Sequence, residues 1–559
     1  MAMTKSGAPS RPRDAGCCTS ATEERGGAGS GADLGARLRD PRCFGPEVEQ
    51  VELVETHISW VLLTGAYAYK VHKPVVLPFL DFGTVEARRR DCEAELRLNR
   101  RLAPDLYLEV VPITGSRDAP RIGVPGPIVD YALKMRQFPA ANRLDRVLAA
   151  GRLTEDHIDS LAADLAAFHA RAGLATTDSR YASRERIATE CMDNFRVLEA
   201  APLEAADQNR LRRLQDWTER SLADHAELFS ARRAAGWVRE CHGDLHLANI
   251  ALIEGRPVPF DCLEFDPDLR WIDTMSETAF LMMDLFAHHR ADLAWRFLDA
   301  YLERSGDYAG IALLRHYLVY RCLVRAKVDA IRLSQAGRGH DEQTHQLKAQ
   351  LALAERLAEA PAETPLIITH GLSGSGKSWL SARLLAPLGA IRVRSDTERR
   401  RLDCAGSNRY GAASSRKTYA RLQETAQRVL NARYPVILDA TFLNQAARGQ
   451  LRAMAARLNV PFRILSVHAP HELLKKRVID RAESENDPSE ATPEVIERQR
   501  TNAEALSPSE RATALVVDTS RPVDVATLVK EIAAAPPPQL RSVADAGAHQ
   551  PPRRNDRDG

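Results

Sequence analysis

A short stretch near the middle of the chain combines acidic and amide side chains at a spacing that could hold a metal–nucleotide complex. Asn249 follows Asp244 by five residues, and Asp261 lies twelve residues further on, after the apolar run Val258-Pro-Phe. Phosphoryl transfer from ATP needs a carboxylate beside the acceptor hydroxyl and oxygen ligands that hold Mg²⁺ on the phosphates. A solvated acidic loop is the alternative, and the combined spacing disfavours it. We predict Asp244 as the catalytic base, with Asn249 and Asp261 as metal ligands.

A glycine-rich loop nearer the C-terminus indicates the same chemistry. It fits the pattern G-x4-G-K-S, follows the apolar run Leu366–His370 and precedes a helical stretch. Its glycines would let backbone N–H groups surround the β-phosphate, while the lysine bridges the β- and γ-phosphates and the last serine binds Mg²⁺. The ATP-binding residues predicted from this loop are Gly371, Leu372, Ser373, Gly374, Ser375, Gly376, Lys377 and Ser378.

Further charged residues follow the glycine-rich loop at positions that suit its chemistry. Asp396 and Asp439 each follow or end an apolar run, which would place them at the carboxyl edge of a parallel sheet, where ligands bind. Asp439 is predicted to hold the metal, through water or directly. Arg477 and Arg481 lie one helical turn apart and are predicted to form a lid that offsets phosphate charge. The alternative for this pair is a solvated helix face.

The elements needed to position these residues divide the chain into two ordered regions. The first opens with short β-like segments and is almost entirely helical from Glu155 onward, interrupted only around 239–265, which is the element order of a protein-kinase-like α+β fold. The second alternates strands and helices, which predicts an α/β fold with a doubly wound parallel sheet. Its expected strands are Leu366–His370, Ala390–Arg394, Pro435–Asp439, Phe462–Val467 and Ala514–Val517.

The amino-acid composition along the chain predicts the domain boundaries. Residues 1–38 and 535–559 are rich in small, charged or proline residues and are predicted to be disordered. We expect a kinase-like domain over 39–338, a helical linker over 339–364 and a P-loop kinase domain over 365–534.

The bulk properties exclude several classes of protein. The 559 residues carry a formal net charge of +2, which gives no electrostatic reason to expect nucleic acid or an anionic membrane as a partner. No apolar run approaches the roughly 20 residues of a membrane helix. The nine cysteines are scattered, with no CxxC pair, which favours reduced thiols and a cytoplasmic location.

The catalytic stretch His242–Ile250, together with Phe260–Asp266, resembles the motifs of the aminoglycoside phosphotransferase family, which shares the protein-kinase fold. The resemblance implies the same roles for Asp244, Asn249 and Asp261. It also implies that Asp273 braces the catalytic loop, although an acid at a helix N-terminus would explain Asp273 equally well. His246 and Cys241 are interpreted as packing residues.

Resemblance to the small lobe of these kinases suggests the remaining ATP contacts of the first region. Lys70 is expected to bind phosphate, with Lys73 in reserve, and Glu95 is expected to pair with Lys70, with Glu93 as the competitor. The backbone near Met135 is expected to meet adenine at the hinge between the lobes.

The second region resembles the P-loop small-molecule kinases, among them gluconate kinase, zeta-toxin-like kinases and polynucleotide 5′-kinase. This implies that Asp396 is the base, that Arg448 contacts substrate or phosphate, and that Thr519 and Arg521 lie near adenine. The order of the two modules resembles the bacterial family called bifunctional aminoglycoside phosphotransferase/ATP-binding protein.

We therefore expect a bifunctional kinase that uses ATP and Mg²⁺ at two sites and phosphorylates small-molecule hydroxyls, with both acceptors open. Two alternatives stay open. Because only Gly65 is available for a glycine loop in the small lobe, that module could be a nucleotide sensor regulating the other. A nucleic-acid 5′-kinase for repair is the second, and the near-neutral charge disfavours it.

Overall fold

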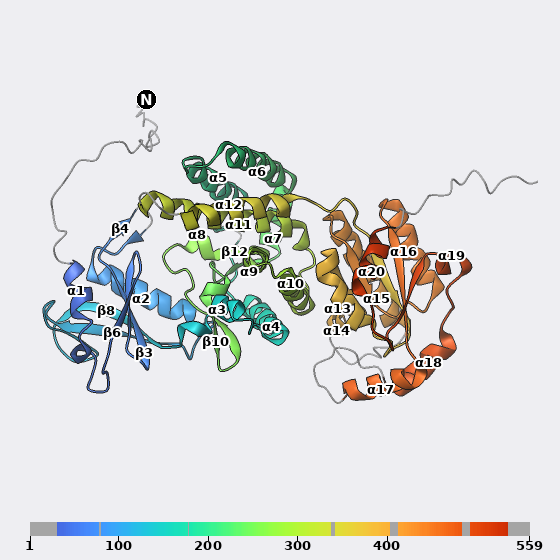
Figure 1. Cartoon of the computed structure of the whole chain (residues 1–559), viewed down its shortest axis with the longest axis horizontal. Coiled ribbons are helices and arrows are strands. Elements are labelled where there is room, and N and C mark those ends of the chain that lie inside the picture. Colours follow the sequence, from blue (N-terminus) through green and yellow to red (C-terminus); the bar gives the residue numbers. More distant parts are fainter. Residues whose placement is uncertain are drawn as a thin grey trace, which may run out of the picture. The chain divides into compact units, whose positions relative to one another are not determined.

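The computed structural model describes residues 31–77, 80–176, 178–336, 341–402, 412–482 and 492–534 (Figure 1). These residues form two compact units. One comprises the chain up to Glu93 together with Tyr107–Gln137, and the other comprises Ala94–Leu106 together with the chain from Phe138 onward.

The first unit is built on an antiparallel sheet with strand order β1-β2-β3-β8-β6-β7. Alternate residues such as Trp60, Leu62 and Val71 face a buried core, as expected for a sheet covered on one side. Its strands are β1 (Glu52–Glu55), β2 (Ser59–Leu63), β3 (Tyr67–His72), β6 (Tyr107–Gly115), β7 (Pro120–Ile122) and β8 (Ile128–Arg136), with β4 (Val76–Leu77) and β5 (Leu80–Asp81) as a separate pair. The helices are α1 (Gly31–Arg37) and the first part of α2 (Val85–Asn99). A buried ion pair, Arg88 Nη2 to Asp130 Oδ2 at 2.8 Å, fastens α2 to β8.

The second unit begins as a helical lobe around α9 (Thr274–Ala287). Every residue of α9 from Thr274 to Leu285 is buried, and apart from Glu277 and Asp284 their side chains are apolar or small on all faces. The surrounding helices are α3 (Leu144–Ala149), α4 (Glu155–Arg171), α5 (Arg184–Glu199), α6 (Ala205–Asp224), α7 (Ala226–Ala234), α8 (Pro267–Arg270), α10 (Ala291–Ser305), α11 (Ile311–Ala336) and α12 (Asp341–Ala358). Two short hairpin-like pairs, β9 (Val238–Glu240) with β12 (Trp271–Asp273) and β10 (Ile250–Ile253) with β11 (Arg256–Pro259), frame the catalytic stretch. This small sheet lobe and large helical lobe confirm the predicted kinase-like fold.

The same unit continues into a parallel sheet with strand order β14-β15-β13-β16-β17. The strands are β13 (Leu366–His370), β14 (Ile391–Arg394), β15 (Val436–Asp439), β16 (Phe462–His468) and β17 (Ala514–Asp518). The helices are α13 (Lys377–Leu388), α14 (Ser395–Leu402), α15 (Ala412–Asn431), α16 (Gln445–Arg457), α17 (His471–Ala482), α18 (Pro493–Asn502), α19 (Pro508–Arg511) and α20 (Val525–Ala533).

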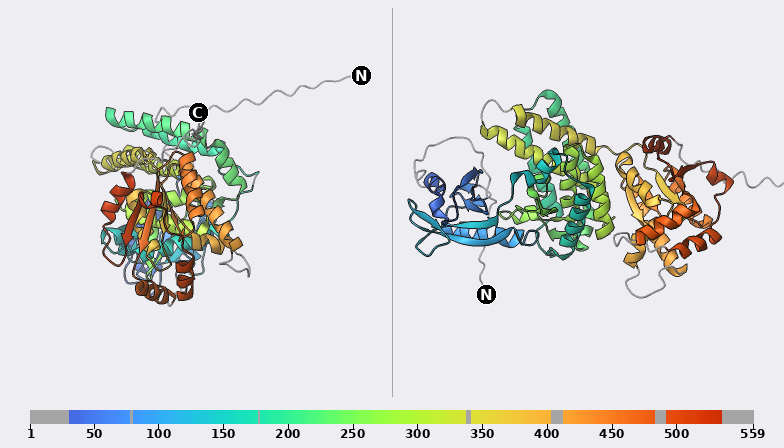
Figure 2. Two further views of the ribbon diagram at one scale, coloured as in Figure 1. Left: turned by 90° about the vertical axis from the view of Figure 1, so that its right-hand side faces the viewer. Right: turned by 60° about the horizontal axis from the view of Figure 1, so that its bottom comes forward.

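Helices cover both faces of this parallel sheet (Figure 2). Ile367 and Ile437 share a core with α13 and α20, whereas their neighbours Ile368 and Leu438 share one with α15 and α16. Because successive side chains of a strand point to opposite faces, strands buried on both sides read as continuous apolar runs. The predicted doubly wound sheet is confirmed.

The stretch expected as a linker forms α12, which packs against α11 and α6 and buries Leu347 and Leu351 in the helical lobe. The predicted domain boundaries remain predictions.

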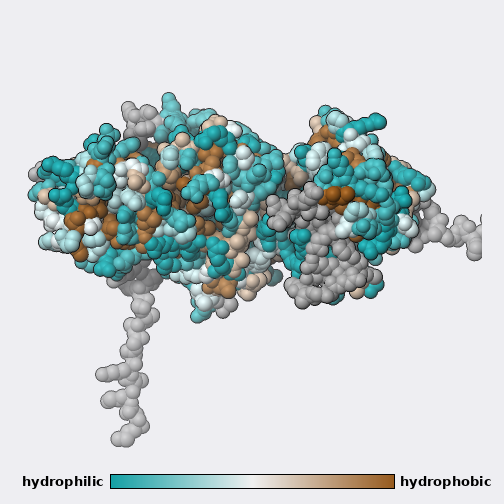
Figure 3. All heavy atoms as spheres, turned by 90° about the horizontal axis from the view of Figure 1, so that it is seen from below, coloured by the Kyte–Doolittle hydropathy of each residue, from teal (hydrophilic) through white to brown (hydrophobic). Residues whose placement is uncertain are grey.

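The surface is mainly polar on the face shown in Figure 3, where hydrophobic residues form separate patches. Within the described ranges, no helix has both the length and the apolar character that a membrane crossing requires.

Candidate active sites

The predicted catalytic residues of the helical lobe lie on a loop that apolar side chains anchor. Leu245, Leu247 and Ile250 are fully buried, which fixes the loop, while Asp244 and Asn249 are half-buried. Asn249 Nδ2 donates to Asp244 Oδ2 at 2.9 Å and to the Asp244 carbonyl at 3.1 Å. The structure therefore brings Asp244 and Asn249 into direct contact.

The segment that carries Asp261 is tied to the same loop. The Phe260 N–H donates to the Asn249 carbonyl at 2.9 Å, and His242 Nε2 lies 2.9 Å from the Phe260 carbonyl. Asp261 has φ of +62°, a left-handed conformation that costs energy for most residues and that Asp tolerates better than most. The predicted metal ligand Asp261 thus directly follows a residue bonded to Asn249, the other predicted ligand.

Two histidines set the electrostatics of the loop. Burial lowers the pKa of His242, so its imidazole is neutral; Nε2 donates to the Phe260 carbonyl, and Nδ1 accepts from the Asp244 N–H at 3.3 Å. His246 Nε2 lies 3.3 Å from Asp244 Oδ2. Desolvation acts to raise the pKa of Asp244, but the charge and hydrogen bond of His246, together with the charge of Arg325, bring it well below its usual range. His246 is therefore a partner of Asp244 as well as the packing residue that the sequence suggested.

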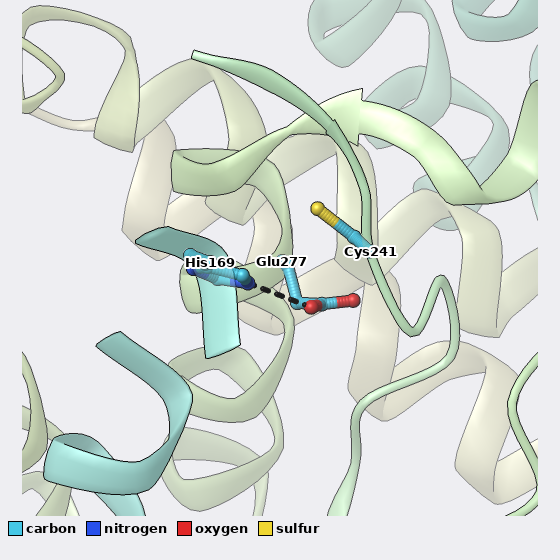
Figure 4. A group of neighbouring side chains, drawn as sticks. All are labelled: His169, Cys241 and Glu277. Atoms are coloured by element: carbon cyan, nitrogen blue, oxygen red, sulfur yellow. Dashed lines mark hydrogen bonds and ion pairs between the residues drawn. The ribbon is translucent and has the colours of Figure 1, made fainter. Parts of the chain in front are cut away.

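A buried network braces the loop from beneath (Figure 4). Glu277 Oε1 accepts the Gly243 N–H at 2.7 Å, and Glu277 Oε2 lies 2.8 Å from His169 Nε2. Desolvation raises the pKa of Glu277, but the hydrogen bond and charge of His169 outweigh it and lower the value to about 2. Further along the loop, Asp284 Oδ2 accepts the Leu247 N–H at 2.8 Å.

Asp273 does not have the bracing role that the resemblance implied. It is the N-cap of α9, accepting the Met275 N–H at 2.8 Å, and it pairs with the buried Arg232 at 2.7 Å. The brace lies one turn further on, at Glu277. Sequence reasoning missed Glu277 and Asp284, although two acids within an apolar helix are a usable signal, since buried carboxylates need partners.

Cys241 lies close to His169 and Glu277, and the possible ligand atoms of the three residues are within 4.8 Å of one another. Burial holds the pKa of the Cys241 thiol well above its usual value, and Sγ lies 3.6 Å from the Ile272 carbonyl. Glu277 is bonded to both His169 and the Gly243 N–H. This group is therefore a structural brace.

The start of the large unit adds two contacts that the sequence did not suggest. Asn99 Oδ1 accepts the Cys262 N–H at 2.9 Å, and Arg101 donates to the Glu240 carbonyl at 2.6 Å and to the Cys241 carbonyl at 3.1 Å. Both ends of the catalytic stretch are thus held by 94–106.

The small-lobe candidates lie on the elements expected of them. Lys70 is on β3, opposite Leu133 of β8, and Met135 pairs with Ala68 and Tyr107. Glu95 is fully buried. Since Lys70 and Glu95 belong to different units, their pairing stays a prediction.

The two reserve candidates have other partners within the small unit. Lys73 Nζ lies 2.6 Å from Glu55 Oε1, and Glu93 lies 2.8 Å from Arg89. Each of these two side chains is therefore engaged in an ion pair of its own.

The glycine-rich loop follows β13 and leads into α13. A Cβ on Gly371 would lie 2.1 Å from the Val467 carbonyl oxygen, and one on Gly374 would lie 2.6 Å from that of Leu474, so both positions require glycine. Lys377 is 8% exposed and its Nζ donates to the Leu372 carbonyl at 2.8 Å. The lysine thus folds back over its own loop, where the phosphates of a nucleotide would lie.

A cavity of about 450 Å³ opens beside this loop. It is lined by most of the side chains predicted for the second site, namely Ser373, Lys377, Ser378, Asp396, Asp439 and Arg477. Asp439 is 5% exposed and accepts a hydrogen bond from Ser381 Oγ at 3.3 Å. The carboxyl ends of β14 and β15 thus meet the N-terminus of α13, as the parallel topology requires.

Arg477 and Thr519 support the loop together. Arg477 Nη1 donates to Thr519 Oγ1 at 2.8 Å and to the Gly374 carbonyl at 3.3 Å, while Thr519 Oγ1 donates to the Ser375 carbonyl at 2.8 Å. Arg521 is largely exposed and lies 3.8 Å from Asp518. The Arg481 side chain lies outside the described residues.

The helix α18 supplies residues that the sequence did not identify. Gln499 Oε1 accepts the Ser373 N–H at 2.9 Å, and Gln499 Nε2 donates to Ser373 Oγ at 3.1 Å. Arg498 lines the same cavity. Gln499 and Arg498 can be identified only from the structure, because α18 folds back against the glycine-rich loop.

Arg448 is not a substrate contact. It is fully buried, and its guanidinium binds Glu510 at 2.8 Å and the Phe442 carbonyl at 3.0 Å. This arginine holds α16 against the start of α19, so the expectation drawn from the resemblance is wrong.

The chain is similar to several known proteins. A family model described as an AAA domain matches residues 366–506, the part that contains the glycine-rich loop. A choline/ethanolamine kinase family protein from Mesorhizobium loti is 13% identical with a TM-score of 0.38, covering 58% of this chain and 94% of its own. A gluconokinase from Sinorhizobium meliloti 1021 is 20% identical with a TM-score of 0.23, covering 30% and 89%. The fold assignment rests on the elements described above.

A longer match comes from Mycobacterium tuberculosis (strain ATCC 25618 / H37Rv), whose "Uncharacterized protein Rv2004c" is 32% identical over 447 residues. The match covers 78% of this chain and 87% of the mycobacterial protein. The chain therefore belongs to the same family as Rv2004c.

Proposed function

We propose that this protein is a kinase with two separate ATP sites, each transferring the γ-phosphoryl group to a hydroxyl of a small molecule. The observation that carries the proposal is the cavity of about 450 Å³ in which Lys377, Ser378, Asp396 and Asp439 meet. A phosphate-binding loop, oxygen ligands for a metal ion and a carboxylate near the acceptor hydroxyl are the parts that phosphoryl transfer requires.

The oxygens at the second site suit a hard cation. The Ser378 hydroxyl and the Asp439 carboxylate are oxygen donors of the kind that Mg²⁺ prefers, and they would hold it directly or through water. When bound, Mg²⁺ would neutralise phosphate charge. Lys377 and the loop N–H groups bind the phosphates, and Asp396 accepts the proton of the acceptor hydroxyl. Arg477 offsets the charge that develops on the transferred group.

The first site would use the other constellation in the same way. Asn249 and Asp261 would hold Mg²⁺, and Asp244 would orient the acceptor hydroxyl and receive its proton. Lys70 binds phosphate, and the backbone at Met135 meets adenine. The support is the 2.9 Å bond between Asp244 and Asn249 and the link from Asn249 to the segment of Asp261.

We further propose that the protein works in the cytoplasm on small molecules, without nucleic acid or membrane as a partner. The near-neutral net charge of +2 supports this, because nucleic-acid binding depends on neutralising many phosphates.

The test is transfer of radiolabelled phosphate from ATP by the full chain to a library of metabolites, antibiotics and a 5′-hydroxyl oligonucleotide. Asp244→Asn and Lys377→Ala are compared singly and together, with Lys530→Ala on the exposed side of α20 as the control. Each single change should slow transfer to its own set of acceptors by about 10²–10³ and leave the other set unchanged.

Three results would change the assignment. Loss of all transfer by Lys377→Ala alone, with ATP still bound at the first site, would make the kinase-like region a sensor. Labelling of the oligonucleotide alone, with a steep salt dependence, would indicate a nucleic-acid kinase. No transfer by the wild type to any acceptor would contradict the proposal.

A further inference from the structure

The helix α18 packs one face against the glycine-rich loop. Ile496 of α18 is fully buried and forms a small core with Leu474 and Val478 of α17, and Leu372 of the loop packs against this core. Gln499 follows Ile496 by three residues, so it lies on the same face of α18. The helix therefore meets the loop with an apolar contact and with an amide side chain next to it.

One peptide group of the loop is bonded at both ends. The Leu372 carbonyl and the Ser373 N–H belong to the same planar peptide group, so they point in opposite directions. Gln499 Oε1 accepts this N–H at 2.9 Å, and Lys377 Nζ donates to this carbonyl at 2.8 Å. The bond to Gln499 and the bond to Lys377 thus both depend on the orientation of one peptide group.

Gln499 also contacts the side chain of the same loop residue. Its Nε2 donates to Ser373 Oγ at 3.1 Å, and the two side chains are both half-buried beside the cavity of about 450 Å³. The two bonds together fix the amide of Gln499 with its oxygen towards the backbone N–H. A backbone N–H that loses such an acceptor needs another partner, which favours a turn of the peptide group.

The orientation of this peptide group affects the position of the Lys377 ammonium. Lys377 is 8% exposed, and the lysine of a phosphate-binding loop reaches the β- and γ-phosphates of the nucleotide. Its Nζ also lies 3.5 Å from Ser375 Oγ, so the bond to the Leu372 carbonyl is one part of what holds it. A charged side chain that is held in place before the ligand arrives loses less conformational freedom on binding.

We infer that Gln499 of α18 is a positioning residue for Lys377, because it fixes the peptide group whose carbonyl Lys377 binds. This inference rests on the proposed nucleotide site at Lys377. It assigns to α18 a role in preparing the phosphate-binding loop, although Gln499 lies 126 positions beyond Ser373 in the chain.

The experiment measures how readily the Lys377 amine is acetylated in the nucleotide-free full chain. A limiting amount of acetic anhydride is added, and the modified lysines are quantified by mass spectrometry with the exposed Lys530 as internal reference. Gln499→Leu should raise the labelling of Lys377 relative to Lys530 by about three- to tenfold, which is the factor that one typical hydrogen bond contributes. Thermal unfolding checks that each variant is folded.

Three further variants sharpen the test. Gln450→Leu, at an exposed glutamine of α16, is the matched control and should leave the labelling of Lys377 unchanged. Gln499→Glu should keep that labelling at or below the wild-type level, because its carboxylate can accept both the Ser373 N–H and the Ser373 hydroxyl. If Gln499→Leu does not fold, Gln499→Ala removes the same two bonds and should raise the labelling in the same way.

The outcomes separate this inference from the proposed function. ADP with Mg²⁺ should protect Lys377 of the wild type from acetylation, and if it does not, the proposed P-loop function fails. If ADP protects Lys377 but removal of the Gln499 amide leaves its nucleotide-free labelling at the wild-type level, the inference fails alone. It also fails if Gln499→Glu is labelled as strongly as Gln499→Leu.

Discussion

Asp244 keeps its charge in a place where burial opposes ionisation. The adjacent His246 outweighs desolvation, so the pKa of Asp244 lies below its usual range and the carboxylate is ionised at neutral pH. A group of low basicity orients a hydroxyl well and takes its proton late, once the oxygen has lost electron density. The geometry that fixes this carboxylate therefore matters more than its basicity.

Glu277 holds the loop that carries Asp244 in place. Its replacement should change how the unfolding free energy depends on pH. The folded-state pKa is about 2 against an ordinary 4.5, so ionised Glu277 contributes stability above pH 4.5 that is lost as the pH falls towards 2. A difference of this size corresponds to about 3 kcal/mol of unfolding free energy at neutral pH.

Glu277→Gln should therefore lower the urea midpoint at pH 7 and flatten its decline between pH 5 and about 3. Urea unfolding of both proteins at several pH values checks this, with Glu342→Gln on the exposed start of α12 as the control. Equal pH slopes for wild type and Glu277→Gln would contradict the role.

Replacing Arg448 tests whether this residue contributes to the stability of the fold or to nucleotide binding. Replacement by Met leaves Glu510 buried without its partner at 2.8 Å, which should cost about 3–5 kcal/mol of unfolding free energy. Nucleotide affinity of the protein that remains folded should not change. Thermal unfolding and calorimetry check the two parts, and Arg448→Met with Glu510→Leu should recover much of the stability. A selective loss of affinity would restore the substrate role.

Local sequence predicted single residues well wherever contact partners are close in the chain. The glycine-rich loop and the pair Asp244–Asn249 are contiguous patterns, and both assemble as expected. Glu277, Gln499 and Arg101 escaped because each reaches its partner from a distant segment. Arg448 was misassigned for the same reason, since its buried partner lies 62 positions away.

At the scale of elements, the strand–loop–helix unit of the P-loop depends on backbone room. Gly371 has φ of +143°, and a side chain there would clash with the Val467 carbonyl of the adjacent β16. Because both the backbone angle and the space exclude a Cβ, the loop would have to shift away from the position that cradles phosphate.

Gly371→Ala should therefore remove Lys377-dependent nucleotide binding while the sheet stays folded. Gly449→Ala is the matched control: this glycine lies inside α16 with open space around it, so the change should stabilise by about 0.5–1 kcal/mol. Calorimetry for binding and far-UV circular dichroism for the fold distinguish the two. Normal ADP binding by Gly371→Ala would show that the loop is not the phosphate site.

The type of each element could be predicted from the sequence because its apolar residues recur in the pattern expected of a strand or a helix. The strands of the parallel sheet are apolar on both faces, and α9 is apolar or small on every face except at Glu277 and Asp284, so their class follows from sequence. The packing of α12 against α11 and α6 was not predicted. A helix with many charged residues is equally consistent with a solvent-exposed linker.

At the scale of the whole molecule, the large unit joins one kinase-like lobe to a P-loop sheet through packed helices and buried ion pairs. Asp299 and Arg392 are each less than a tenth exposed, at 9% and 8%. No pattern in either segment identifies the other, because the pairing depends on how α10 meets β14 in space. Because the two regions share a core of this kind, ligand binding to one of them should also stabilise the other.

The last prediction follows from that shared core. ADP with Mg²⁺ at 100 times its dissociation constant should stabilise the unit by about 2.7 kcal/mol, and amides of α4 and α10 should exchange hydrogen more slowly. Mass-spectrometric hydrogen exchange measures this, and the part absent from Lys377→Ala belongs to the P-loop site. Asp299→Asn should reduce the protection of α10 without abolishing binding, because it removes a buried partner of Arg392. Protection confined to the P-loop sheet in the wild type would mean that the two kinase folds are linked covalently but not energetically.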